Sequence, residues 1–198
     1  MIALVDYGAG NLTSVKKALA AVGADVRVPQ QPGDLADAQG IIVPGVGHFG
    51  ATERLKGAWT DAILARVGEG RPLLGICLGM QWLYESSDEA PDVPGLGLLA
   101  GRCYRLPANG VKIPHVGWND LHIVHAAPIL DEVASESQVY FTHSYVAPAT
   151  NDTAATTEHG STFAAVVQRG HVAGVQFHPE KSGDVGLRIL RNFLAMVG

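Results

Sequence analysis

Residues 73–81, LLGICLGMQ, carry the strongest indication of how this chain folds. The apolar run 73–76 is typical of a buried strand, and the residues after Cys77 have helical character. Gly75 and Gly79 leave room for a sharp turn between the two. A strand that turns into a helix at a nucleophilic side chain forms a nucleophile elbow, and the start of a helix favours the thiolate. The stretch therefore predicts a reactive cysteine on an α/β scaffold.

Cys77 also has a less specific interpretation. A buried structural thiol is the commoner fate of an isolated cysteine in an apolar run, and the short pattern GxCxG leaves both interpretations open. Cys103 lies in an expected strand with no such turn around it, and we expect it to be structural. Two cysteines do not form a disulfide framework in a chain long enough to bury a core, so we expect a reducing, cytoplasmic setting.

The first half of the chain alternates between short β-branched runs and stretches with helical spacing, which predicts a parallel sheet covered on both faces. The expected strands are 2–5, 26–28, 41–43 and 73–76, and the expected helices are 12–22, 59–67 and 78–84. The second half is rich in Val, Thr, Phe and Tyr, which predicts antiparallel hairpins that extend the sheet. These segments lie near 98–106, 111–124, 138–147, 153–158, 162–168 and 171–177, and a helix is expected from about Asp184.

The composition limits the classes of function. With 198 residues, 47% of them apolar and 17% charged, we expect a single domain spanning 1–198. The net charge of -5 argues against a general nucleic-acid binder, which needs a basic face. No apolar run is long enough to span a bilayer, and the start of the chain lacks the features of a secretory signal, so we expect no membrane association.

Residues 174–180, GVQFHPE, supply a candidate base for the cysteine. A strand is expected to end near His178, because Pro179 prevents its regular continuation. Glu180 is placed to orient one imidazole nitrogen while the other faces the thiol, which is the logic of a catalytic triad. Any one of the eight histidines is more often structural than catalytic. Their spacing lacks a zinc signature, so we expect no metal, and nothing indicates a cofactor.

The segments GICLGMQ (75–81) and GVQFHPE (174–180), in this order, closely resemble the two signatures of class I (triad) glutamine amidotransferases. Further segments are similar to the glutaminase subunits of imidazole glycerol phosphate synthases, and they are 6–12, 115–119, 140–145 and 178–183. The resemblance runs from the first expected strand to the last expected helix. It departs from the family at Val146, where a second aromatic residue is expected after Tyr145.

The resemblance implies a flavodoxin-like sheet and a cysteine-dependent glutaminase. Cys77 would attack the side-chain amide of glutamine, and His178, held by Glu180, would protonate the leaving ammonia and activate water against the thioester. Backbone N–H groups of Leu78 and of the Val46–Gly47 loop would hold the oxyanion. Without Cys77 nearby, that loop would be an ordinary turn after a strand.

The resemblance also implies how glutamine is bound. Gln81 lies four residues after Cys77, on the same helical face, and is expected to bind the substrate. Glu89 is expected to meet the α-amino group, although a solvated loop carboxylate is an equal alternative. The remaining expected substrate-binding residues are Gly45, His143, Ser144 and Tyr145, of which the last three have packing of a strand as their alternative.

The family implies a protein partner, a (β/α)8 synthase subunit that receives the ammonia. That subunit combines ammonia with a phosphoribulosyl formimino nucleotide to form imidazole glycerol phosphate and an aminoimidazole carboxamide ribotide, in histidine biosynthesis. The resemblance leaves no residues for a barrel, so we expect a heterodimer of separate chains. Trp118 and Asn119 are expected at the interface, because large aromatic residues are favoured there, with a buried core tryptophan as the alternative.

Three other functions compete with this one. A glutaminase of the same chemistry could serve a different synthase, such as pyridoxal phosphate synthase, but the segments around Cys77 and Trp118 argue against it. A cysteine hydrolase of γ-glutamyl peptides would be active alone. A non-enzymatic regulatory subunit would not need Cys77, His178 and Glu180.

Overall fold

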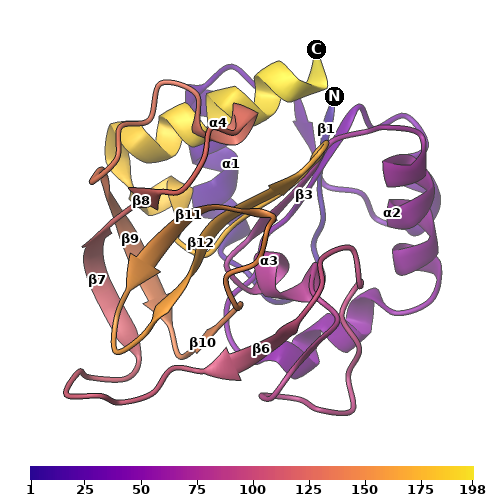
Figure 1. Cartoon of the computed structure of the whole chain (residues 1–198). Helices are drawn as coiled ribbons and strands as arrows, with labels where there is room; N and C mark the ends of the chain where they lie inside the picture. Colours follow the sequence, from indigo (N-terminus) through magenta and orange to yellow (C-terminus); the bar gives the residue numbers. More distant parts are fainter.

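An eight-stranded sheet crosses the centre of the protein, with helices on both of its faces (Figure 1). The structure is a computed structural model that describes residues 1–198. The strand order is β2-β1-β3-β4-β13-β12-β11-β8. The first five strands are parallel, and they are β1 (Ile2–Leu4), β2 (Val26–Arg27), β3 (Gly40–Val43), β4 (Leu73–Ile76) and β13 (Val172–Val175). The other three pair antiparallel, and they are β12 (Thr162–Arg169), β11 (Thr153–Glu158) and β8 (His122–Ile123).

The parallel strands are apolar along their whole length because side chains are buried on both faces of the sheet. Ile42 of β3 faces a core shared with helices α1 (Leu12–Ala21) and α4 (Gly183–Val197). Its neighbours Ile41 and Val43 face the other core, which includes residues of α2 (Ala58–Gly68) and α3 (Leu78–Trp82). Figure 1 shows α1 and α4 together on one side of the sheet and α2 on the other.

Two smaller sheets accompany the central one. Strands β7 (His115–Asp120) and β9 (Gln138–His143) form an antiparallel ribbon at the edge of the molecule (Figure 1). Strands β5 (Ser86–Ser87), β6 (Arg102–Arg105) and β10 (Tyr145–Val146) form the other. Short 3-10 segments complete the chain, and they are η1 (Pro32–Leu35), η2 (Phe49–Leu55), η3 (Pro128–Leu130) and η4 (Pro179–Lys181). No helix is long and apolar enough to cross a membrane.

The expected fold class is confirmed, and three of the expected details differ in the structure. Only β8, β11, β12 and β13 of the later strands join the central sheet, because β7 and β9 pair with each other and β6 pairs with β5 and β10. The expected strand at 138–147 is divided into β9, which pairs with β7, and β10, which pairs with β6 in the small sheet. The carbonyl of Ser144, between the two strands, accepts a hydrogen bond from the N–H of Leu106. The helix after Cys77 ends at Trp82, two residues earlier than expected.

Candidate active site

Cys77 lies at the carboxyl end of β4, directly before α3, and its side chain is buried. Its φ of 53° is in the left-handed region, which is uncommon for a residue with a side chain and marks a strained turn at a site. Close backbone packing enforces this turn. A Cβ atom on Gly75 would lie 2.6 Å from the Gly79 carbonyl oxygen, and one on Gly79 would lie 1.8 Å from the carbonyl oxygen of Val43. The geometry is that of a nucleophile elbow.

His178 reaches the same edge of the sheet because β13 pairs parallel with β4, with Val175 opposite Ile76. Its Nδ1 lies 2.8 Å from Oε1 of Glu180, and both side chains are buried. A carboxylate only accepts hydrogen bonds, so Nδ1 carries a proton. The other nitrogen, Nε2, has no hydrogen-bond partner of normal length in the protein.

The charge state of His178 follows from its neighbours. Burial lowers the pKa of the imidazole, but its interactions with Cys77 and Glu180 outweigh burial and raise the pKa to about 10. At neutral pH His178 is therefore protonated, with Glu180 on one side of the ring and Cys77 on the other. A cation in this position can donate a proton to a leaving group next to the thiol.

A cavity of about 300 Å³ opens beside the thiol. Eight residues that the sequence singled out line it along with two others, and the ten are Gly47, Cys77, Leu78, Gln81, Glu89, Pro114, Thr142, His143, Ser144 and Tyr145. Of these, Pro114 and Thr142 were not expected from the sequence. Gly45 and Val46 directly precede the lining residue Gly47 in the chain but do not line the cavity themselves. A larger cavity of about 880 Å³, between β8, η3 and α4, does not include Cys77.

The side chain of Gln81 is fixed from two directions. Its Nε2 donates to the carbonyl of Tyr145 at 2.8 Å and to Oε1 of Gln176 at 3.0 Å. Because a backbone carbonyl can only accept, the amide nitrogen must face it, and Oε1 of Gln81 remains for a ligand in the cavity. Gln176 in turn donates from Nε2 to Sγ of Cys77 at 3.6 Å. Sequence reasoning missed Gln176, although it lies inside the GVQFHPE segment.

Glu89 is tied to the loop that follows β3. Its Oε2 accepts a 2.7 Å hydrogen bond from the backbone N–H of Phe49, the first residue of η2. The carboxylate also lines the cavity. It is therefore held in place at the cavity and is not a freely solvated loop carboxylate.

Two of the three expected oxyanion donors, Val46 and Leu78, are engaged within the protein. The N–H of Leu78 donates to the carbonyl of Gly45 at 3.3 Å, and the N–H of Val46 donates to the carbonyl of Ala9 at 3.2 Å. The Gly45 carbonyl and the Val46 N–H belong to one peptide unit. In this structure that unit presents its oxygen, and not its hydrogen, to the neighbourhood of Leu78. Gly47 follows with a φ of 97°, a conformation that favours glycine.

The profile of the family described as "Glutamine amidotransferase class-I" matches residues 3–197. An "Imidazole glycerol phosphate synthase subunit HisH" from Gloeobacter violaceus is 52% identical over 98% of this chain and 88% of its own length. One from Methanothermobacter thermautotrophicus is 44% identical over 100% of this chain and 99% of its own.

The chain belongs to the class I glutamine amidotransferases, in the HisH family. A solved structure described as "Crystal structure of glutamine amidotransferase" covers 100% of both chains with a TM-score of 0.79 at 24% identity, a likeness in fold.

Two histidines of this amidotransferase, His143 on the cavity wall and its neighbour His115, belong to one hydrogen-bonded chain. Asn119 Nδ2 lies 3.2 Å from Nε2 of His115, whose Nδ1 lies 3.1 Å from Nε2 of His143. Nδ1 of His143 lies 3.1 Å from the carbonyl oxygen of Tyr145, the same oxygen that Gln81 binds. Burial lowers the pKa of His115 to about 4 and that of His143 to about 3, so both imidazoles are neutral.

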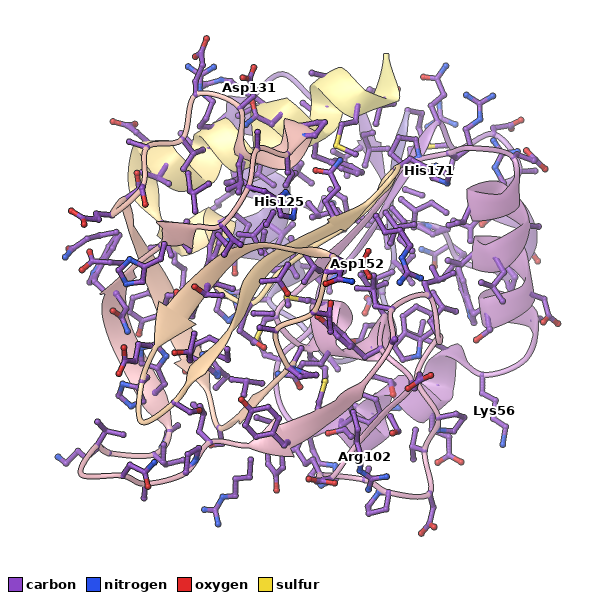
Figure 2. The ribbon with its side chains drawn as sticks, in the orientation of Figure 1. Lys56, Arg102, His125, Asp131, Asp152 and His171 are labelled. Carbon is purple, nitrogen blue, oxygen red and sulfur yellow. The ribbon has the colours of Figure 1, made fainter.

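Other histidines of the amidotransferase lie away from the thiol. His171, labelled in Figure 2, directly precedes β13 and is therefore at the opposite end of that strand from His178. Its Nε2 contacts the carbonyl oxygen of Val67 at 2.8 Å. His125, also labelled in Figure 2, contacts the carbonyl oxygen of its neighbour Ala126. These contacts are structural.

Trp118 and Asn119 face opposite sides of β7. Trp118 is 55% exposed on the outer face with Val116, which contradicts the alternative of a buried core tryptophan. Its ring packs edge-on against that of Tyr140 of β9. Nζ of Lys181 lies over the same tyrosine ring, 5.5 Å from its centre. Asn119 points inward, where its Nδ2 donates to the carbonyl of Glu158 at 3.0 Å as well as approaching His115.

Proposed function

We propose that this protein is the glutaminase subunit of imidazole glycerol phosphate synthase and works in the cytoplasm as a single domain. It hydrolyses glutamine and passes the ammonia to a separate (β/α)8 synthase subunit, in histidine biosynthesis. The observation that carries the proposal is the Cys77 elbow beside the buried His178–Glu180 pair, in a chain that matches HisH relatives over nearly its whole length.

The chemistry follows from the charges at the site. The Cys77 thiolate attacks the side-chain carbonyl carbon of glutamine, and the tetrahedral intermediate collapses to a thioester as the His178 cation gives its proton to the departing ammonia. The neutral His178 then takes a proton from water, whose oxygen attacks the thioester. Glutamate leaves, and Cys77 and His178 return to their starting charges. Glu180 keeps the imidazole oriented throughout.

Substrate recognition is shared around the cavity. Oε1 of Gln81 accepts from the substrate, and the carboxylate of Glu89 pairs with the α-amino group. The backbone of His143, Ser144 and Tyr145 holds the α-carboxylate. Support comes from the position of these five residues on the cavity wall and from the fixed amide of Gln81.

The isolated subunit is nearly silent in this proposal. The N–H groups of Val46 and Leu78 are engaged within the protein, and one removed oxyanion donor typically costs about 10²–10³ in rate. A half-turn of the Gly45–Val46 peptide unit would direct the Val46 N–H inward and release the Leu78 N–H, and docking of the synthase subunit would favour that turn. The outer face of β7 and β9, with Val116, Trp118 and the partly buried Tyr140, is the proposed docking surface, because the apolar side chains of Val116 and Trp118 are exposed.

The test is glutamate release from glutamine by the purified chain, alone and with a histidine-pathway synthase subunit and its nucleotide ligand. Activity that requires the partner and disappears in Cys77→Ala supports the proposal. Rapid hydrolysis by the chain alone would instead favour an independent amide hydrolase. Activity retained in Cys77→Ala would contradict the thioester mechanism.

A further inference from the structure

The hydroxyl of Tyr7 is buried and has no hydrogen-bond partner. Tyr7 follows β1 in the segment 6–10, and the mechanism described above does not use it. Buried hydroxyl groups in folded proteins are nearly always hydrogen-bonded, so an unpaired one needs a physical explanation. An acceptor that is present only in another state of the protein is one such explanation.

This hydroxyl lies against the peptide unit that decides the oxyanion geometry. A Cβ atom on Gly45 would lie 2.1 Å from Oη of Tyr7 and 2.8 Å from Cβ of Leu78, so the phenol packs directly on the glycine backbone. Burial, with a smaller contribution from the charge of Cys77, raises the pKa of Tyr7 above its ordinary value. The phenol is therefore protonated at neutral pH and is available as a donor.

The segment that carries Tyr7 also holds the peptide unit in its present orientation. The carbonyl of Ala9, two residues on, accepts the Val46 N–H at 3.2 Å. The segment is itself anchored, because Asp6 accepts from the N–H of Gly8 at 2.9 Å and Arg54 donates to the carbonyl of Tyr7 at 3.2 Å. One anchored segment thus presents an acceptor and an unused donor to the same peptide unit.

A half-turn of the Gly45–Val46 unit frees two donors but leaves two acceptors, the carbonyls of Gly45 and Ala9, without their present donors. The Gly45 carbonyl loses the Leu78 N–H and turns toward the side where Ala9 now accepts. A carbonyl without a donor there would disfavour the turned state. Tyr7 offers the donor that the turned carbonyl lacks.

We propose that the hydroxyl of Tyr7 donates to the Gly45 carbonyl once this peptide unit has turned, so that Tyr7 is a positioning residue for the oxyanion donors of Val46 and Leu78. The inference rests on the proposed function, which supplies the turned state. Tyr7 does not contact the substrate in this scheme. It acts by stabilising the backbone conformation that does.

The experiment compares Tyr7→Phe with Tyr84→Phe, a matched control that removes another buried hydroxyl without a partner. We expect Tyr7→Phe to lower kcat for glutamine about five- to tenfold in the complex with the synthase subunit, the effect of one hydrogen bond, while KM changes little. Alkylation of Cys77 by iodoacetamide forms no oxyanion, so its rate should stay at the wild-type value. Tyr84→Phe should leave kcat and alkylation unchanged.

The outcomes separate the inference from the proposed function. An unchanged kcat in Tyr7→Phe overturns the inference, and so does an equal loss of kcat and alkylation, which would indicate general damage to the site. A loss of the same size in Tyr84→Phe also overturns it. If the wild-type chain is not stimulated by the synthase subunit, the proposed function fails. In that case the inference is tested on the slow hydrolysis of glutamine by the chain alone. Tyr7→Phe should again lower kcat about five- to tenfold, and Tyr84→Phe should leave it unchanged.

Discussion

Gln81 donates a 3.0 Å hydrogen bond to the side chain of Gln176, 95 residues further along the chain. Gln176 is fully buried and also contacts Sγ of Cys77 at 3.6 Å. The pair therefore joins the helix after the candidate nucleophile to the strand that leads to His178. It couples the cavity wall to the thiol through side chains alone.

Replacing Gln176 should loosen the amide of Gln81. In Gln176→Leu, Gln81 keeps only its bond to the Tyr145 carbonyl, so its Oε1 is less well placed and KM for glutamine should rise about three- to tenfold, the effect of roughly one hydrogen bond. Steady-state kinetics of glutamine hydrolysis in the complex measure this. Gln168→Leu removes a partly buried glutamine that binds the backbone of Ile129 instead, and its KM should be unchanged. Equal KM values for Gln176→Leu and wild type would contradict the role of the pair.

Glu180→Gln should lower both the activity and the pH dependence of stability. The folded protein holds the His178 proton up to a pKa of about 10, whereas the unfolded chain loses it near 6.5. This contribution to stability is fully present below about pH 6.5 and disappears as the pH rises through about 10. We expect kcat to fall about 10²–10⁴-fold in the variant.

Urea unfolding near pH 6 and near pH 10 measures the stability part of this prediction. The variant should be less stable than wild type near pH 6, and the difference should shrink toward pH 10. Glu53→Gln is the control, because it makes the same charge change at an exposed position and should not alter how stability depends on pH. A stability difference that is the same at both pH values would show that Glu180 does not hold the His178 proton.

The elbow should not tolerate a methyl group at Gly75. An added Cβ would lie 2.6 Å from the Gly79 carbonyl oxygen and 2.7 Å from the backbone nitrogen of Met80, neither of which can move freely. We expect Gly75→Ala to reduce the free energy of unfolding by about 3 kcal/mol. Gly68→Ala, in α2 with open space around it, should raise it by about 0.5 kcal/mol. Urea denaturation compares the two, and similar values would argue against the packing at the elbow.

The exposed Trp118 should dominate binding of the synthase subunit. Trp118→Ala is expected to weaken that binding by about 2 kcal/mol, roughly 30-fold in Kd, with little change in stability because the side chain is half exposed. Val124→Ala is the control, since Val124 is 60% exposed but follows β8 and is outside the β7–β9 ribbon. Isothermal titration calorimetry gives both Kd values. Equal Kd values for the two variants would show that the β7–β9 ribbon does not contact the synthase subunit.

Local patterns in the sequence were sufficient for much of the fold and the chemistry. The apolar run before Cys77 and the glycines around it predict the elbow, because the backbone can pass through that turn only with small neighbours. The two-residue spacing of His178 and Glu180 predicts their contact for a similar reason, since a proline between them ends the strand at a fixed point. Alternating strands and helices predict the parallel half of the sheet.

Register and packing between distant segments decided the rest. The contact of Gln81 with Gln176 exists only because β4 and β13 lie side by side in register. The separate β7–β9 ribbon, the exposure of Trp118 and the position of Tyr7 against Gly45 depend on how whole elements pack, and local composition does not encode these. The sequence by itself thus determined which groups carry the chemistry. The tertiary structure alone decided where the oxyanion donors point, because the N–H groups of Val46 and Leu78 find their acceptors, Ala9 and Gly45, in segments far away in the sequence.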